Sequence, residues 1–77
     1  MTEQQVLAVV ADALDVPCAR LHRSSVAADF AEWDSMGTLA ILTALAHHGV
    51  SIEPWKVDKL QSVDGILSEV LTAGMLK

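Results

Sequence analysis

The most constraining feature of this sequence is an apolar run over residues 36–46, dominated by Ala and Leu. Only Gly37, Thr38 and Thr43 interrupt it. These residue types favour a helix, and a helix that is apolar nearly all round is either buried or presents an apolar face to a partner. A chain of 77 residues cannot easily cover one helix on every side. We therefore predict a helix over 35–48 with part of its surface exposed and used.

A first helix is predicted over residues 3–15. Thr2 can cap this helix, and Gln5 stands where a capping-box partner belongs. Pro17 stops the helical pattern. The helix has one apolar face with helical spacing, formed by Val6, Leu7, Val10, Ala13 and Leu14.

Two more helices are predicted after Gly49, which ends the apolar helix in the usual glycine stop position. Pro54 suits the first turn of a short helix that runs to about Leu60. Ser62 can cap a last helix, which Gly74 closes. That last helix carries a complete apolar stripe, formed by Val63, Ile66, Leu67, Val70 and Leu71.

The connection over residues 16–34 shows no clean period. Connections of this length are uncommon in compact domains and are often functional. Trp33 in the connection and Trp55 in the short third helix are each expected to anchor a loop to the bundle. Four singly spaced apolar residues should pack the connection onto the core, namely Val16, Leu21, Val26 and Phe30. The predicted fold is an all-α four-helix bundle with a long first loop and a short third helix, in a single domain over residues 1–77.

Size and charge narrow the range of functions. A domain this small has little room for a walled active site beside its core, so a self-contained enzyme is not expected. The net charge of −5 repels phosphate backbones, so no nucleic-acid partner is expected either. Such a charge suits a partner with a basic face, or it only keeps a very apolar small protein soluble.

The cellular location is predicted from three features. Cys18 is the only cysteine, so no internal disulfide can form. The start of the chain lacks the basic residues of a secretion signal, and no apolar run reaches the ~20 residues of a membrane span. We therefore expect a cytoplasmic protein without a membrane span.

The segment most informative about chemistry is the junction between the long loop and the apolar helix. Ser35 lies at the predicted helix N-terminus, where free backbone N–H groups and the positive end of the helix dipole favour a phosphate. Asp34 beside it could bind a metal ion or a basic residue of a modifying enzyme. The alternative is that Asp34 or Ser35 only caps the helix, since Asp-Ser before a helix is common.

The stretch Trp33-Asp34-Ser35-Met36-Gly37 resembles the modification site of the acyl and peptidyl carrier protein family. That family carries Asp-Ser-Leu or a close variant at the start of its second helix, and its serine receives 4′-phosphopantetheine. The resemblance covers nearly the whole chain. The other matching parts are the first-helix pattern, the phenylalanine of the long loop, the second-helix run and the entry to the last helix, at residues 6–16, 30, 39–45 and 60–63.

This resemblance implies a carrier protein rather than an enzyme, with 4′-phosphopantetheine attached to Ser35 and with Asp34 in the same site. The thiol of the arm would hold an acyl or aminoacyl group as a thioester. The implied partners are a phosphopantetheinyl transferase, an acyl- or aminoacyl-activating enzyme and a downstream transferase or synthase. Within the family, the stretch is similar to the Trp-Asp-Ser-Leu-Gly form of stand-alone carriers in specialised gene clusters, and to the Asp-Ser-Phe-Gly-Thr form of D-alanyl carrier proteins.

One departure from the family concerns the second helix, which has no acidic residue where fatty-acid carriers have several. Partner recognition should then rest more on apolar contact than on charge steering. The departure favours a dedicated partner set, such as a polyketide, nonribosomal-peptide or aminoacyl-carrier system. The side predicted to face the core has Ile41, Leu42 and Leu45, and the candidate partner-binding residues on the opposite side are Met36, Leu39, Ala40 and Thr43.

Two alternatives from other classes stay open. The first is a helical adaptor that never carries an arm and binds partners through the apolar second helix. The second is a small hydrolase, which would need a base within reach of Ser35. His47 and His48 lie about three turns away on the same helix, so only His22 could serve, and no Gly-x-Ser-x-Gly elbow surrounds the serine. Because His47 and His48 are adjacent, their side chains point about 100° apart on a helix, and no metal site is expected there.

Overall fold

The computed structural model describes residues 1–74, and residues 75–77 of the predicted domain lie outside the described part. The described chain contains three α-helices and three 3₁₀ helices and no strand. Four of these elements coincide with the four predicted helices, which confirms the all-α expectation. In chain order the elements are α1 (Glu3–Leu14), η1 (Cys18–Arg20), η2 (Ala27–Asp29), α2 (Ser35–His47), η3 (Pro54–Leu60) and α3 (Val63–Thr72).

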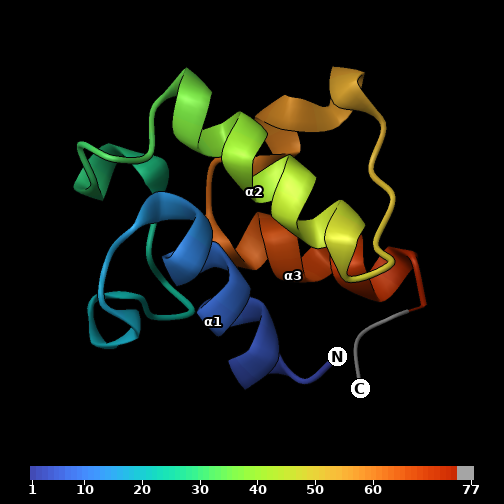
Figure 1. The fold of residues 1–77 in the computed structure, drawn as a ribbon, viewed down its shortest axis with the longest axis horizontal. Helices are drawn as coiled ribbons and strands as arrows, with labels where there is room; N and C mark the ends of the chain where they lie inside the picture. Colours follow the sequence, from blue (N-terminus) through green and yellow to red (C-terminus); the bar gives the residue numbers. More distant parts are fainter. Residues whose placement is uncertain (75–77) are drawn as a thin grey trace.

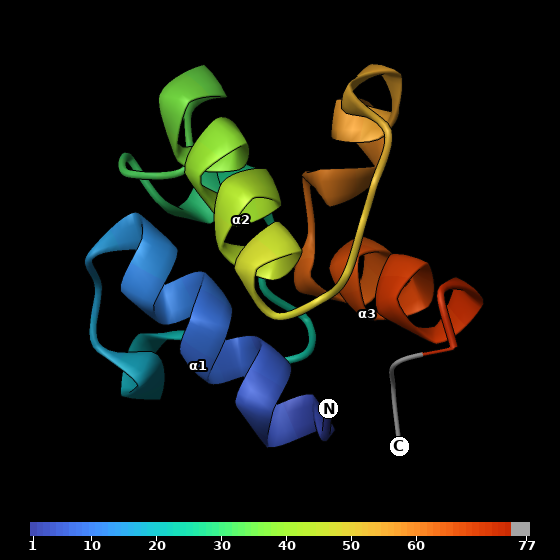
Figure 2. The same cartoon turned by 45° about the vertical axis from the view of Figure 1, so that its right-hand side comes forward.

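The four longer elements form a ring around the core (Figure 1, Figure 2). α2 packs against α1 on one side and against η3 on the other, and α3 contacts both η3 and α1. None of the helices within residues 1–74 has the length and apolarity that crossing a bilayer requires. The largest fully buried side chains come from all four elements and from the links beside them, and are Val6, Val10, Ile41, Leu45, Val50, Leu60, Val63, Ile66 and Val70.

α1 begins at the predicted capping box. The Gln5 N–H donates to Thr2 Oγ1 (3.2 Å), and the Thr2 N–H donates to Gln5 Oε1 (2.8 Å). The helix ends one residue earlier than predicted, because Asp15 adopts a left-handed conformation with φ 57° and caps it. The predicted apolar face is buried except for Ala13, which is half-buried.

The long loop is held by backbone hydrogen bonds to the segment that enters α3. The Ala27 N–H donates to the Gln61 carbonyl (2.7 Å), and the Val63 N–H donates to the Ser25 carbonyl (3.0 Å). The prediction for Val26 is wrong, since 39% of its surface is exposed. Its backbone forms a β-bridge with the N-cap of α3, and its side chain faces solvent instead of the core. The other three predicted packing residues are buried, namely Val16, Leu21 and Phe30.

α2 begins at Ser35 as predicted and ends at His47, one residue before the predicted end, and the predicted glycine stop of α2 and serine cap of α3 are confirmed. α2 stops before Gly49, which has φ 85°, and α3 begins after Ser62, whose Oγ accepts the Gly65 N–H at 3.0 Å. The predicted stripe of α3 faces the core except at its last member, Leu71, which is exposed.

η3 presents Trp55 to solvent, with 72% of its surface exposed, so the prediction that Trp55 anchors a loop is wrong. The side chain lies in the first turn of η3, outside the ring of helices, and Lys56 Nζ lies 5.4 Å from the centroid of the indole. Lys56 also pairs with Glu53 Oε2 (3.6 Å) and with Glu69 Oε1 (3.7 Å). The pair with Glu69, rather than the tryptophan, connects the start of η3 to α3, whereas the pair with Glu53 is local.

Candidate functional site

The loop enters α2 through Asp34, which is the helix cap, and Ser35 is the first residue of the helix. Asp34 Oδ1 accepts the Gly37 N–H at 2.9 Å, and the Asp34 carbonyl accepts the Thr38 N–H at 2.9 Å. Of the two residues that could have capped the helix, Asp34 does so. The side chain of Ser35 is therefore left without a capping role.

Ser35 is exposed, and its hydroxyl forms no hydrogen bond with any residue of the range 1–74. The backbone N–H groups of Ser35 and Met36 also find no acceptor in that range, as expected in the first turn of a helix. They lie at the positive end of the α2 dipole. A hydroxyl group and two free N–H donors thus lie together at the solvent-facing start of α2.

Two contacts fix the position of the loop end that carries the serine. At Gly37, a Cβ atom would overlap the Glu32 carbonyl oxygen and would lie 2.9 Å from Leu14 Cδ2, so only glycine lets the loop lie directly against the helix. Trp33 is buried, and its Nε1–H donates to the Leu60 carbonyl (3.1 Å), which confirms that it anchors the loop. Glu32 and Trp33, the loop residues that lead to Asp34 and Ser35, are therefore held against α2 and against η3.

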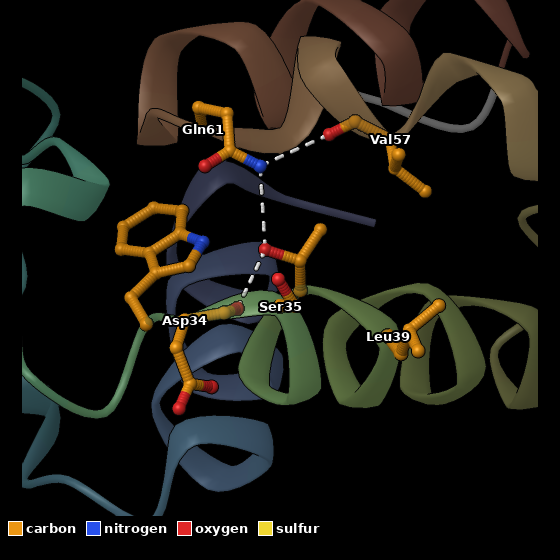
Figure 3. A pocket seen from close by; sticks show the side chains of 7 residues that line it. Asp34, Ser35, Leu39, Val57 and Gln61 are labelled. Carbon is orange, nitrogen blue, oxygen red and sulfur yellow. Dashed lines mark hydrogen bonds between the residues drawn. The ribbon is translucent and has the colours of Figure 1, made fainter.

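A groove of about 520 Å³ lies beside Ser35, between α2 and η3 (Figure 3). Figure 3 shows side chains from α2 and from the η3 segment on opposite sides of it, while the Asp34 carboxylate points away from Gln61. Apolar and polar side chains both contribute to the lining, which consists of Asp34, Ser35, Trp33, Thr38, Leu39, Val57 and Gln61.

The predicted partner-binding residues differ in exposure. Met36 and Leu39 are exposed over 75% and 49% of their surface, as expected for a helix too apolar to be fully covered. Thr43 is exposed, and its hydroxyl donates to the Leu39 carbonyl (3.0 Å), whereas Ala40 is half-buried. The side predicted to face the core is fully buried at Ile41 and Leu45 and half-buried at Leu42.

The sequence does not predict three of the groove residues, which are Thr38, Val57 and Gln61. Gln61 Nε2 lies 3.3 Å from Thr38 Oγ1, although the two residues are 23 positions apart. The contact exists because η3 packs on α2. No motif or spacing signals it, since a Gln before a helix cap is ordinary in any helical protein.

The histidines lie away from the groove, and none of them lines it. His47 and His48 are at the C-terminal end of α2, and His22 is in the long loop. The hydrolase alternative needs a base at Ser35, and none of these histidines hydrogen-bonds it. Within residues 1–74, no three His, Cys, Asp or Glu side chains are grouped so that they could hold a metal ion.

The start of α2 combines an exposed serine hydroxyl, free backbone N–H groups and a neighbouring groove. The serine oxygen is open to solvent, the two free N–H groups favour a negative charge, and the groove offers apolar contact at Leu39 and Val57. Comparisons of the chain with protein-family models, curated proteins and solved structures find no match. The geometry of the site is therefore the basis on which a function is proposed.

Proposed function

We propose that this chain is a carrier protein whose Ser35 is the attachment point of a 4′-phosphopantetheine arm, and that it delivers an acyl or aminoacyl group to partner enzymes. The observation that carries the proposal is the exposed Ser35 hydroxyl, unbonded within residues 1–74, beside a groove of about 520 Å³. A serine with a purely structural role at this position would cap the helix, and Asp34 already does so.

In the proposed modification, Ser35 Oγ attacks the phosphorus of coenzyme A that bears the pantetheine. A P–O bond forms to Oγ, the P–O bond to the second phosphate breaks, and adenosine 3′,5′-bisphosphate leaves with the electron pair. The hydroxyl proton passes to a base of the transferase. In this proposal the free N–H groups of Ser35 and Met36 hydrogen-bond the resulting phosphodiester, whose negative charge the α2 dipole favours.

When bound, the arm would supply a thiol that holds a carboxylic acid as a thioester. Leu39 and Val57 offer apolar contact beside the attachment point. Asp34 keeps one carboxylate oxygen on the cap, and its other oxygen has no hydrogen bond within residues 1–74. That oxygen is available to a basic residue or a metal ion of the transferase.

The proposed docking face is the exposed side of α2, formed by Met36, Leu39 and Thr43 with Ala40 at its edge. α2 carries no acidic side chain, so apolar contact rather than charge steering would select the transferase, the activating enzyme and the downstream enzyme. This favours a polyketide, nonribosomal-peptide or aminoacyl-carrier system over ordinary fatty-acid synthesis. A cytoplasmic location belongs to the same proposal, because coenzyme A is available there.

A second candidate function is a helical adaptor that binds partners through α2 without an arm. The observation in its favour is that Met36 and Leu39 are exposed on an otherwise packed helix. This candidate requires no modification of Ser35, so the two functions can be separated chemically.

The test is intact-mass analysis after incubation with coenzyme A and a promiscuous phosphopantetheinyl transferase. We expect the wild type to gain the mass of the arm and the Ser35→Ala variant to gain nothing. Ser24→Ala is the matched control, since Ser24 is an exposed loop serine away from the groove, and it should gain the arm like the wild type. No mass gain with any transferase would reject the carrier and favour the adaptor. Labelling of Ser35 by an acyl-serine probe without a transferase would instead indicate the hydrolase.

A further inference from the structure

The side chain of Gln61 is exposed and spans the two elements that border the groove (Figure 3). Gln61 Nε2 donates to Thr38 Oγ1 on α2 (3.3 Å) and to the Val57 carbonyl on η3 (3.2 Å). The Val57 carbonyl can only accept, so the amide must point its nitrogen toward it. Both hydrogens of the amide nitrogen are thereby used, and Gln61 forms a polar bridge between the two elements that border the groove.

Thr38 completes this bridge. Its side chain is almost fully buried, and its hydroxyl donates to the Asp34 carbonyl at 3.0 Å. Because the hydroxyl hydrogen is used there, the oxygen is left to accept from Gln61. A continuous chain of hydrogen bonds therefore runs from η3 through Gln61 and Thr38 to the residue before Ser35.

The backbone of Gln61 is held from a third direction. Its carbonyl accepts the Ala27 N–H of the long loop at 2.7 Å, and the next residue, Ser62, forms the β-bridge with Val26. Gln61 thus joins the long loop, α2 and η3 at one point. The backbone position from which its side chain reaches the groove is therefore fixed.

α2, η3 and α3 each contribute a fully buried side chain to the hydrophobic core. Ile41, Leu60 and Ile66 have no exposed surface. A long alkyl chain entering the core between α2 and η3 would have to displace the Gln61 amide, and would leave the oxygen of the buried Thr38 without the donor that it accepts from. Burial of unpaired polar groups opposes that entry.

The groove itself favours a group with a hydrogen-bond donor. Gln61 Oε1 has no hydrogen bond within residues 1–74, so it is an open acceptor at the groove. No Lys, Arg or His belongs to the lining, and the Asp34 carboxylate points away from Gln61. A hydrogen-bond donor therefore matches the open Gln61 acceptor better than a carboxylate does.

From these contacts we infer that Gln61 is a specificity-determining residue, which bars long alkyl cargo from the core and leaves the groove to short acyl groups that carry an amino or hydroxyl donor. This inference rests on the proposed function, since it concerns the cargo of the arm on Ser35. The simplest member of the class is a small aminoacyl group.

The test uses the full chain loaded by a promiscuous transferase with stable amide analogues of octanoyl- and alanyl-coenzyme A, with loading checked by intact mass. Methyl resonances of Ile41, Leu60 and Ile66 report entry of the cargo into the core, and the side-chain amide resonance of Gln61 reports contact in the groove. In the wild type we expect the octanoyl arm to leave the core methyls unshifted and the alanyl arm to shift the Gln61 amide.

Variants that remove the contact between Gln61 and Thr38 should let the octanoyl arm shift the core methyl resonances. Gln61→Ala removes the bridge, and the octanoyl arm should then shift the core methyls. Thr38→Val keeps the side-chain volume but removes the acceptor, so it should give a smaller shift in the same direction and serves if Gln61→Ala does not fold. Gln4→Ala, at an exposed position of α1, is the matched control and should behave like the wild type.

The outcomes distinguish the two proposals. A chain that accepts no arm overturns the proposed function and this inference together. A loaded wild type whose core methyls shift with the octanoyl arm overturns only the inference. The same holds if Gln61→Ala and Thr38→Val are indistinguishable from Gln4→Ala, or if the alanyl arm leaves the Gln61 amide unshifted.

Discussion

α1 and α2 are similar in length, at 12 and 13 residues, and they pack against each other, but they use their apolar side chains differently. α1 buries every large apolar side chain that it carries. α2 buries Ile41 and Leu45 and leaves Met36 and Leu39 exposed. The apolar surface that packing does not need is thus concentrated on α2, at the same end as Ser35.

The two helices also differ in whether the side chain of their first residue has a partner. The first residue of α1, Glu3, pairs with Arg23 at 3.4 Å. The first residue of α2, Ser35, has no partner within residues 1–74. α2 therefore combines a first residue without a partner and exposed apolar side chains, and α1 has neither feature. For this reason α2 is the candidate functional helix.

The largest expected change in the free energy of unfolding comes from a substitution on the buried side of α2, and a substitution on its exposed side should change it much less. Ile41→Ala removes a side chain without exposed surface and should lower the free energy of unfolding by about 2–5 kcal/mol. Leu39→Ala should lower it by no more than about 1 kcal/mol, because half of that side chain is already in water. Urea denaturation followed by circular dichroism measures both. Equal losses would show that Leu39 belongs to the core and would remove the contrast with α1.

The next effect concerns the entries of α2 and α3, which are built alike. A Cβ at Gly37 would overlap the Glu32 carbonyl, and a Cβ at Gly65 would overlap the Lys59 carbonyl. Gly37→Ala and Gly65→Ala should each cost about 1–3 kcal/mol, since the neighbouring backbone must shift. Only Gly37→Ala should also slow arm attachment several-fold, because only that entry positions Ser35.

Initial rates of mass gain, measured on the folded fraction of each variant, decide this point. Gly65→Ala is the control, because it produces the same kind of packing defect away from the serine. If both variants accept the arm at the wild-type rate, the contact at Gly37 does not position Ser35 for modification.

The smallest effect on stability is expected at the proposed docking face. Met36→Glu should alter the free energy of unfolding by about 0.5 kcal/mol or less, and Leu39→Glu, like Leu39→Ala, should lower it by no more than about 1 kcal/mol. They should nevertheless slow loading of the arm by the cognate activating enzyme more than added salt does, because an apolar contact is lost. Leu71→Glu, on the exposed side of α3, should leave loading unchanged. A strong salt dependence combined with tolerance of both substitutions on α2 would argue for docking through charge.

Helix ends could be predicted because they depend on residues close in sequence. Thr2, Gly49 and Ser62 mark such ends at the positions where the structure has them. The direction in which a loop or 3₁₀ side chain points depends on distant contacts. Val26 and Trp55 are predicted to pack inward and are exposed for this reason.

The candidate site likewise has parts that could be predicted from local sequence and parts that depend on distant contacts. A polar loop that turns into an apolar helix locates Asp34 and Ser35 from sequence alone, but the structure decides that Asp34 is the cap. The bridge between Gln61 and Thr38 could not be predicted, because it depends on how η3 lies against α2. The groove beside the serine is a property of packing rather than of any motif.

The groove has two borders of unequal stiffness. α2 is an α-helix of 13 residues, whereas η3 is a 3₁₀ helix of seven residues, a length uncommon for that type because its hydrogen-bond geometry is poorer. At its end Gln61 ties η3 to α2, and near its start Lys56 ties it to α3. Gln61 also holds the Val57 carbonyl, so the side of η3 at the groove is fixed by side-chain contacts rather than by a regular helix. The spacing of the two borders therefore depends on Gln61, whereas the position of Ser35 depends on the Asp34 cap and on the close contact at Gly37.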